Sequence, residues 1–75
     1  MTKLEFLNQI TYLNNIKSLD ELRIVNNFKK VVFKYENRDK IIKTSQGRMM
    51  LRLMKKKCKY REFQNLYIKF LLGTK

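Results

Sequence analysis

Hydrophobic residues recur at helical spacing from the start of the chain. The first apolar face is formed by Leu4, Phe6, Leu7, Ile10, Thr11 and Leu13. Thr2 and Glu5 have the spacing of a capping box, in which each residue bonds the backbone N–H of the other. Asn14 and Asn15 follow, and asparagine tolerates the left-handed conformation that ends many helices. These signals together predict a helix over residues 3–14.

A second and clearer apolar stripe follows. Its members are Leu22, Val25, Phe28, Val32 and Tyr35, flanked by Leu19, Ile24 and Val31, while Arg23, Asn26, Asn27, Lys30 and Lys34 occupy the opposite face. Ser18 and Glu21 form a second capping-box pattern, so we predict a helix from residue 19 to about residue 35. The β-branched and aromatic content of 31–35 is also typical of a strand. The helical spacing runs through that segment unbroken, which favours the helix.

The middle of the chain is less regular. Residues 36–40 form a polar connector, and Ile41 and Ile42 resume the apolar pattern. Either Thr44 or Ser45 caps a new helix, or Asp39 opens one that continues through Gly47. Glycine inside a helix costs about 1 kcal/mol relative to alanine, so we expect a break or frayed turn at Gly47.

The segment after Gly47 separates charge from apolar surface. On a helix, Arg48, Arg52, Lys55, Lys56 and Lys59 fall within one arc about 100° wide. We call these five residues the cationic ridge. The other side holds Met49, Met50, Leu53, Met54, Cys58 and Tyr60, with Lys57 as the one charged intruder. We expect the methionines to form a core stripe and Cys58 to be a small buried residue on that stripe, although neighbouring lysines would also favour a reactive thiolate.

The apolar face then changes direction. The residues concerned are Tyr60, Phe63, Leu66, Tyr67, Phe70 and Leu71, and on a continuous helix they centre about 130° from the methionine face. A straight helix cannot bury both faces, so we predict a turn near 57–59 and a last helix that ends before Gly73. The two tyrosines are expected in the core before any role in stacking on nucleobases.

The predicted fold is therefore all-α, a bundle of about four short helices in a single domain over residues 1–75. Its last two helices have the order of a helix-turn-helix pair, although the turn at 57–59 contains no glycine. A chain of this length buries only about 60% of its unfolded surface. Forming a homodimer or docking on a partner would bury further apolar surface.

Charge is the strongest global property of the chain. Lys and Arg number 18 against 6 Asp and Glu, giving a net charge of +12. Residues 39–75 hold eleven of the basic side chains and only two of the acidic ones. Such a surplus favours a polyanionic partner, either nucleic acid or an acidic protein surface.

Several function classes lack the residues they need. The chain has no histidine, one cysteine, two glycines and scattered carboxylates, so we expect no metal site, no cofactor and no enzymatic activity. No segment reaches the roughly 20 apolar residues of a membrane span, and the N-terminus does not resemble a secretory signal. The single Cys58 fits a reducing cytoplasm or organelle matrix. The absence of alanine and proline suggests an AT-rich genome, such as that of a low-GC bacterium, its phages or plasmids, or an organelle.

The sequence favours a small nucleic-acid-binding protein, a regulator or accessory factor, with DNA slightly preferred. The candidate contact residues are Arg48, Arg52, Lys55, Lys56, Lys59, Arg61, Gln64 and Asn65. Arginine pairs with guanine, glutamine and asparagine pair with adenine, and lysine holds phosphates. The alternative is a protein that binds and modulates another protein through its basic, methionine and aromatic surface, as phage- or plasmid-type effectors do. A structural component of a ribonucleoprotein would share the same electrostatics.

Overall fold

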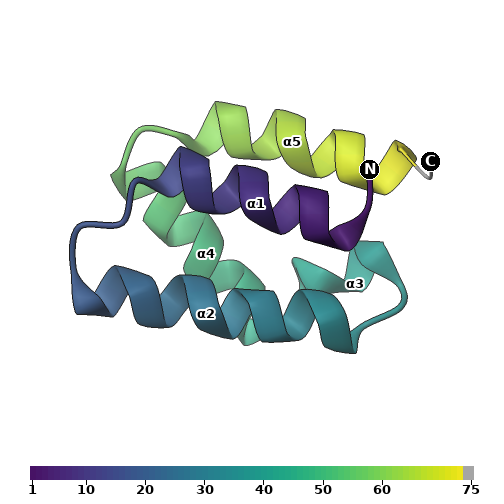
Figure 1. Cartoon of the computed structure of the whole chain (residues 1–75), viewed down its shortest axis with the longest axis horizontal. Helices are drawn as coiled ribbons and strands as arrows, with labels where there is room; N and C mark the ends of the chain where they lie inside the picture. Colours follow the sequence, from purple (N-terminus) through teal and green to yellow (C-terminus); the bar gives the residue numbers. More distant parts are fainter. Residues whose placement is uncertain (74–75) are drawn as a thin grey trace.

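The computed structural model describes residues 1–73, which form five helices and no strand. The helices are α1 (Lys3–Asn14), α2 (Leu19–Lys34), α3 (Arg38–Ile41), α4 (Ser45–Lys56) and α5 (Tyr60–Leu72) (Figure 1). The all-α class and the small helical bundle are confirmed. The prediction had omitted α3, a single turn within a segment read as a connector.

The helices pack in two pairs. α1 lies beside α5 and runs in the opposite direction, while α4 packs most extensively against α2 (Figure 1). α3 contacts α2 and α5 at the end of the bundle where α1 begins and α5 ends. There the ammonium of Met1 donates to the carbonyl of Gly73. The start of α1 and the end of α5 are thus joined by a contact between their flanking residues.

An aromatic cluster fills the centre of the bundle. Phe6 of α1 stacks on Phe70 of α5 with ring centroids 4.1 Å apart. Phe28 of α2 lies 6.2 Å from Phe6 and 6.1 Å from Phe63. Phe63, Tyr67 and Phe70 are all buried, which confirms the predicted core face of the last helix. Because three helices contribute rings, this cluster fixes α5 relative to α1 and α2.

The ends of the first two helices follow the capping signals in part. Thr2 and Glu5 form the full predicted box, with bonds of 2.9 and 3.1 Å, and Asn15 takes the left-handed conformation with φ 49°. Ser18 accepts from the N–H of Glu21 at 3.3 Å, but the Glu21 carboxylate contacts Lys57 instead of completing a second box.

The course of α2 decides between the two readings of residues 31–35. The helix continues to Lys34, so the helical reading is confirmed and the strand reading is wrong. Tyr35 already has extended backbone angles, and its N–H still donates to the carbonyl of Val31. The predicted end at about residue 35 therefore differs by one position.

The break expected at Gly47 lies just before Ser45 instead, and Thr44 caps the new helix, as one of the predicted alternatives had it. α4 begins at Ser45 and includes Gly47, whose N–H donates to the Thr44 hydroxyl at 3.0 Å. A Cβ at position 47 would lie 2.4 Å from the carbonyl oxygen of Ile41 and 2.8 Å from Cα of Ile42. Glycine is required here because the backbone leading out of α3 passes too close for a side chain. A helix running from Asp39 through Gly47 is also excluded, since α3 ends at Ile41.

The turn between α4 and α5 lies at residues 57–59, where the change of apolar face predicts it. The N–H of Cys58 donates to Lys55 O at 3.1 Å, and that of Lys59 to Met54 O at 2.8 Å. This is the Schellman pattern, which puts the intervening residue in the left-handed region, and Cys58 has φ 61°. Its side chain is exposed. The prediction of a buried Cys58 is wrong because the turn rotates that position out of the methionine face.

Several predicted core positions are also exposed. Met49 of the methionine face is 45% exposed, although Met50 and Met54 are buried. Leu4, Leu19 and Leu22 are exposed as well. Each of these four residues lies far around its helix from the centre of the buried arc, so its side chain does not point into the core. The predicted apolar faces were therefore wider than the faces that the bundle buries.

Candidate functional site

Four residues of the cationic ridge share the outer face of α4. Arg48, Arg52, Lys55 and Lys56 are exposed, while Met50, Leu53 and Met54 on the opposite arc are buried. No carboxylate within residues 1–73 forms an ion pair with any of these four cations. Their charges are therefore available to an anionic partner.

The fifth ridge residue and Tyr60 border this face at the turn. Lys59 lies past the end of α4, and its ammonium is 3.9 Å from the Glu62 carboxylate. Both side chains are about half exposed, so this pair is weak. The ammonium of Lys55 lies 5.0 Å from the centroid of the half-buried Tyr60 ring. An aromatic edge therefore adjoins the cations where α4 meets α5.

The candidate residues of α5 are exposed but do not all face the ridge. Arg61, Gln64 and Asn65 are on the outer side of the helix. Gln64 is only about 40° around the helix from Tyr60, whereas Asn65 is about 140° away. Asn65 borders a hollow on the α1 side, next to Tyr12. Gln64 thus lies toward the ridge, and Asn65 lies apart from it.

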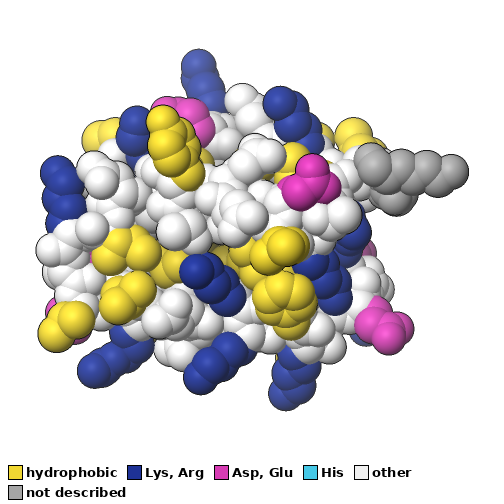
Figure 2. Space-filling model, in the orientation of Figure 1, with side chains coloured by type: hydrophobic (Ala, Val, Ile, Leu, Met, Phe, Trp, Pro, Cys, Tyr) yellow, Lys and Arg dark blue, Asp and Glu magenta, His cyan; other side chains and the backbone are white. Residues whose placement is uncertain are grey.

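Basic side chains also cover other parts of the surface. Arg23, Lys30 and Lys34 are exposed on α2, on the face predicted for them. Figure 2 shows the side of the molecule seen in Figure 1, where Lys and Arg side chains stand separately with apolar groups between them. A polyanion would therefore be attracted from several directions. α2 also carries four cations, but it contains Asp20 and Glu21, whereas all four cations of α4 are exposed and that helix has no acidic residue.

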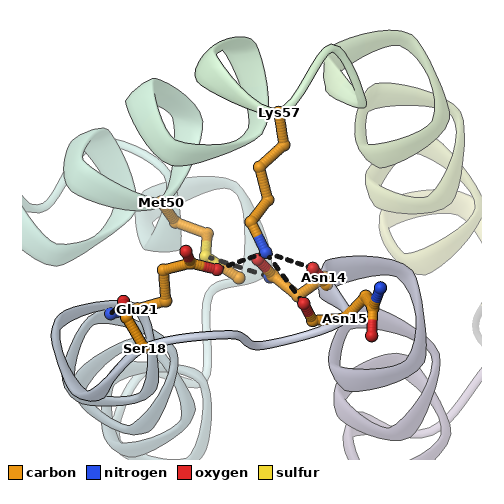
Figure 3. A network of polar contacts seen from close by, with 6 residues as sticks. All are labelled: Asn14, Asn15, Ser18, Glu21, Met50 and Lys57. Carbon is orange, nitrogen blue, oxygen red and sulfur yellow. Dashed lines mark hydrogen bonds and ion pairs between the residues drawn. The ribbon is translucent and has the colours of Figure 1, made fainter.

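Lys57 is a cation whose ammonium is held by contacts with α1 and α2 and does not belong to the exposed ridge (Figure 3). Its ammonium contacts the Glu21 carboxylate and the carbonyl of Asn14, and donates to Asn15 O at 3.2 Å. The hydrogen bond from Lys57 is the main reason that the pKa of Glu21 is lowered. The sequence signal for this role was the position of Lys57 as the only cation on the apolar side of its segment.

Arg38 is a second structural cation, and sequence reasoning missed it. Its guanidinium lies 4.2 Å from the centroid of the Phe70 ring. It donates to the carbonyls of Met1 at 3.0 Å and Phe70 at 2.5 Å. The hydroxyl of Tyr67 donates to the Arg38 carbonyl at 2.5 Å, and burial raises the pKa of Tyr67. Arg38 therefore joins α3 to Met1 and to α5, and nothing in its polar sequence context indicated this.

Two other kinds of functional feature, a metal site and a membrane-spanning helix, are absent from the described residues. Within 1–73 there is no group of three or more side chains suited to hold a metal ion. None of the helices there has the length and hydropathy needed to cross a membrane. No protein-family model, curated protein or solved structure matches the chain.

Proposed function

We propose that this protein binds nucleic acid, with the outer face of α4 against the phosphate backbone. The supporting observation is the row of four exposed cations, Arg48, Arg52, Lys55 and Lys56, without a carboxylate partner among the described residues. Helical rise places successive members of this row within reach of neighbouring phosphates of one strand. The net charge of +12 adds a general attraction to the same partner.

The salt dependence of binding tests this proposal. Four phosphate contacts predict a slope of log K against log salt of about −4 on duplex and about −3 on single strands. The double variant Arg48→Ala/Lys55→Ala should reduce the slope by about 2. Fluorescence anisotropy with labelled DNA and RNA over a salt series measures both quantities. A flat salt response would count against nucleic acid as the partner.

A matched variant distinguishes binding by the ridge from attraction by the net charge of the protein. Arg23→Ala/Lys30→Ala on α2 removes the same charge from another exposed helix face. If the ridge holds the phosphates, this variant keeps most of the affinity and nearly the full slope. Equal losses in the two double variants would mean that binding follows net charge and not the α4 face.

A second candidate function is supported by the outer face of α2. Leu19 and Phe33 are 80% and 56% exposed there, and a hollow next to Leu19 is bordered by Arg23 and Lys30. Apolar anchors beside cations suit an acidic protein surface. Recovery of partners from lysate with and without nuclease separates the two functions, because nuclease should abolish recovery only when nucleic acid is the link.

A further inference from the structure

A cavity of about 310 Å³ opens between the start of α2 and the ridge side of α4. Its apolar lining comes from Ile24, Met49 and Leu53, and Arg52 and Lys56 of the ridge stand at its wall. The cavity therefore adjoins the surface proposed to hold phosphates. Exposure of Met49 at 45% shows that the apolar lining is reached from solvent.

The cavity is also lined by an acidic residue from the first turn of α2. Asp20 lines it, is exposed, and forms no ion pair with a cation of residues 1–73. Glu21 lines it too, but that carboxylate is held by Lys57. A phosphate would be repelled by Asp20, so the anionic part of a ligand belongs outside, on Arg52 and Lys56. The group that enters must be flat or apolar and must offer a hydrogen-bond donor to Asp20.

We infer that this cavity takes an unstacked nucleobase that carries an exocyclic amino group, from a single strand held on the ridge. The inference rests on the proposed function and specifies its substrate class. The faces of a base are apolar enough to lie against Ile24 and Met49, as unstacked bases lie against apolar side chains in other single-strand sites. Asp20 accepts from an amino group such as that of cytosine. Uracil offers a carbonyl oxygen at that position, which the carboxylate repels.

Two consequences distinguish this cavity from simple phosphate binding. A base in a duplex is paired and stacked, so single strands should bind more tightly than duplex of equal charge at low salt. Cytosine and uracil have nearly the same size, so a difference between them reports their polar edges, where cytosine has the amino group and uracil has a carbonyl oxygen and an N3–H. Neither the preference for single strands nor the preference for cytosine depends on how many phosphates the ridge contacts.

Anisotropy with oligo-dC and oligo-dU of equal length, and with an oligo-dC·dG duplex of half that length so that its charge is the same, tests the inference. Oligo-dC should bind about fivefold or more tightly than oligo-dU, because one good contact to a base discriminates by about that factor. Asp20→Ala should remove the difference. Glu36→Ala, which removes the same charge from an exposed residue outside the cavity, should preserve it.

A second measurement reports entry of the base directly. The methionine methyl groups can be labelled with ¹³C, and Met49→Leu assigns the signal of Met49. Ring-current shifts on adding oligo-dC should move Met49 and leave Met1, which does not line the cavity, in place. Binding of both oligonucleotides with equal affinity and no shift of Met49 would overturn the inference and leave the proposed function standing. No binding of any oligonucleotide would overturn both.

Discussion

The ammonium of Lys57, at the end of α4, contacts the carboxylate of Glu21 in the first turn of α2 (Figure 3). The same ammonium bonds the carbonyls of Asn14 and Asn15, where α1 ends. One side chain therefore connects three helices at the end of the bundle opposite α3. The side chains of Lys57 and Glu21 are only 17% and 22% exposed, so water replaces these contacts poorly.

Replacing Lys57 by methionine should lower the free energy of unfolding. The apolar stem is kept, but the carbonyl of the buried Asn14 loses its side-chain partner, which costs about 1–3 kcal/mol. Lys56→Met is the matched control, because it removes the same charge from an exposed neighbour and should change stability by less than about 0.5 kcal/mol. Urea denaturation of both variants measures the difference. Equal stabilities would show that the Lys57 contacts add nothing to folding.

The Glu21 carboxylate should also make stability depend on pH. Lys57 lowers the pKa of Glu21 in the folded protein below the ordinary value of 4.5. The folded state then favours the ionised carboxylate, so its stabilisation is present above pH 4.5 and is lost as pH falls through the lower folded pKa. Wild type should exceed Glu21→Gln in stability at neutral pH, and the gap should narrow in acid. Urea denaturation as a function of pH measures this gap.

The background variant Lys57→Met provides the control for the pH experiment. The main cause of the lowered pKa of Glu21 is then absent. Glu21→Gln in that background should show a gap that is small and nearly independent of pH. A gap of unchanged size would assign the acid dependence to another group.

The features of this fold that the sequence predicts correctly depend on residues that lie close together in the chain. Thr2 with Glu5, Asn15, and the change of apolar face at 57–59 are local signals, and the structure follows them. The contacts of Arg38 and Lys57 depend on segments far away in sequence; the apolar pattern marks Lys57 as an exception but does not name its partners. Gly47 depends on the backbone of Ile41 and Ile42, only five or six residues earlier, whose course the pattern does not give. The ridge was placed correctly along α4 because four of its members share one helix, whereas Asn65 belongs to another side of another helix.

Gly47→Ala should destabilise the protein, against the usual helix preference. Alanine is the better helix former by about 1 kcal/mol, so an unconstrained site would gain stability. The added Cβ would instead meet backbone atoms of Ile41 and Ile42 at 2.4–2.9 Å, and such overpacking costs about 1–3 kcal/mol. Thermal and urea unfolding measure the sign. Asn8→Ala, at an exposed position within α1, should be neutral or stabilising.

Cys58→Gly should stabilise the protein. Cys58 holds φ 61° in the turn between α4 and α5, and a residue with a Cβ pays roughly 1–2 kcal/mol in the left-handed region. Glycine avoids that cost but loses more conformational entropy on folding, so the expected net gain is about 1 kcal/mol. Cys58→Ala removes the thiol and keeps the strained backbone, so it should give no comparable gain. Urea denaturation under reducing conditions compares the three proteins. An equal gain in Cys58→Ala would assign the effect to the exposed thiol and not to the backbone angle.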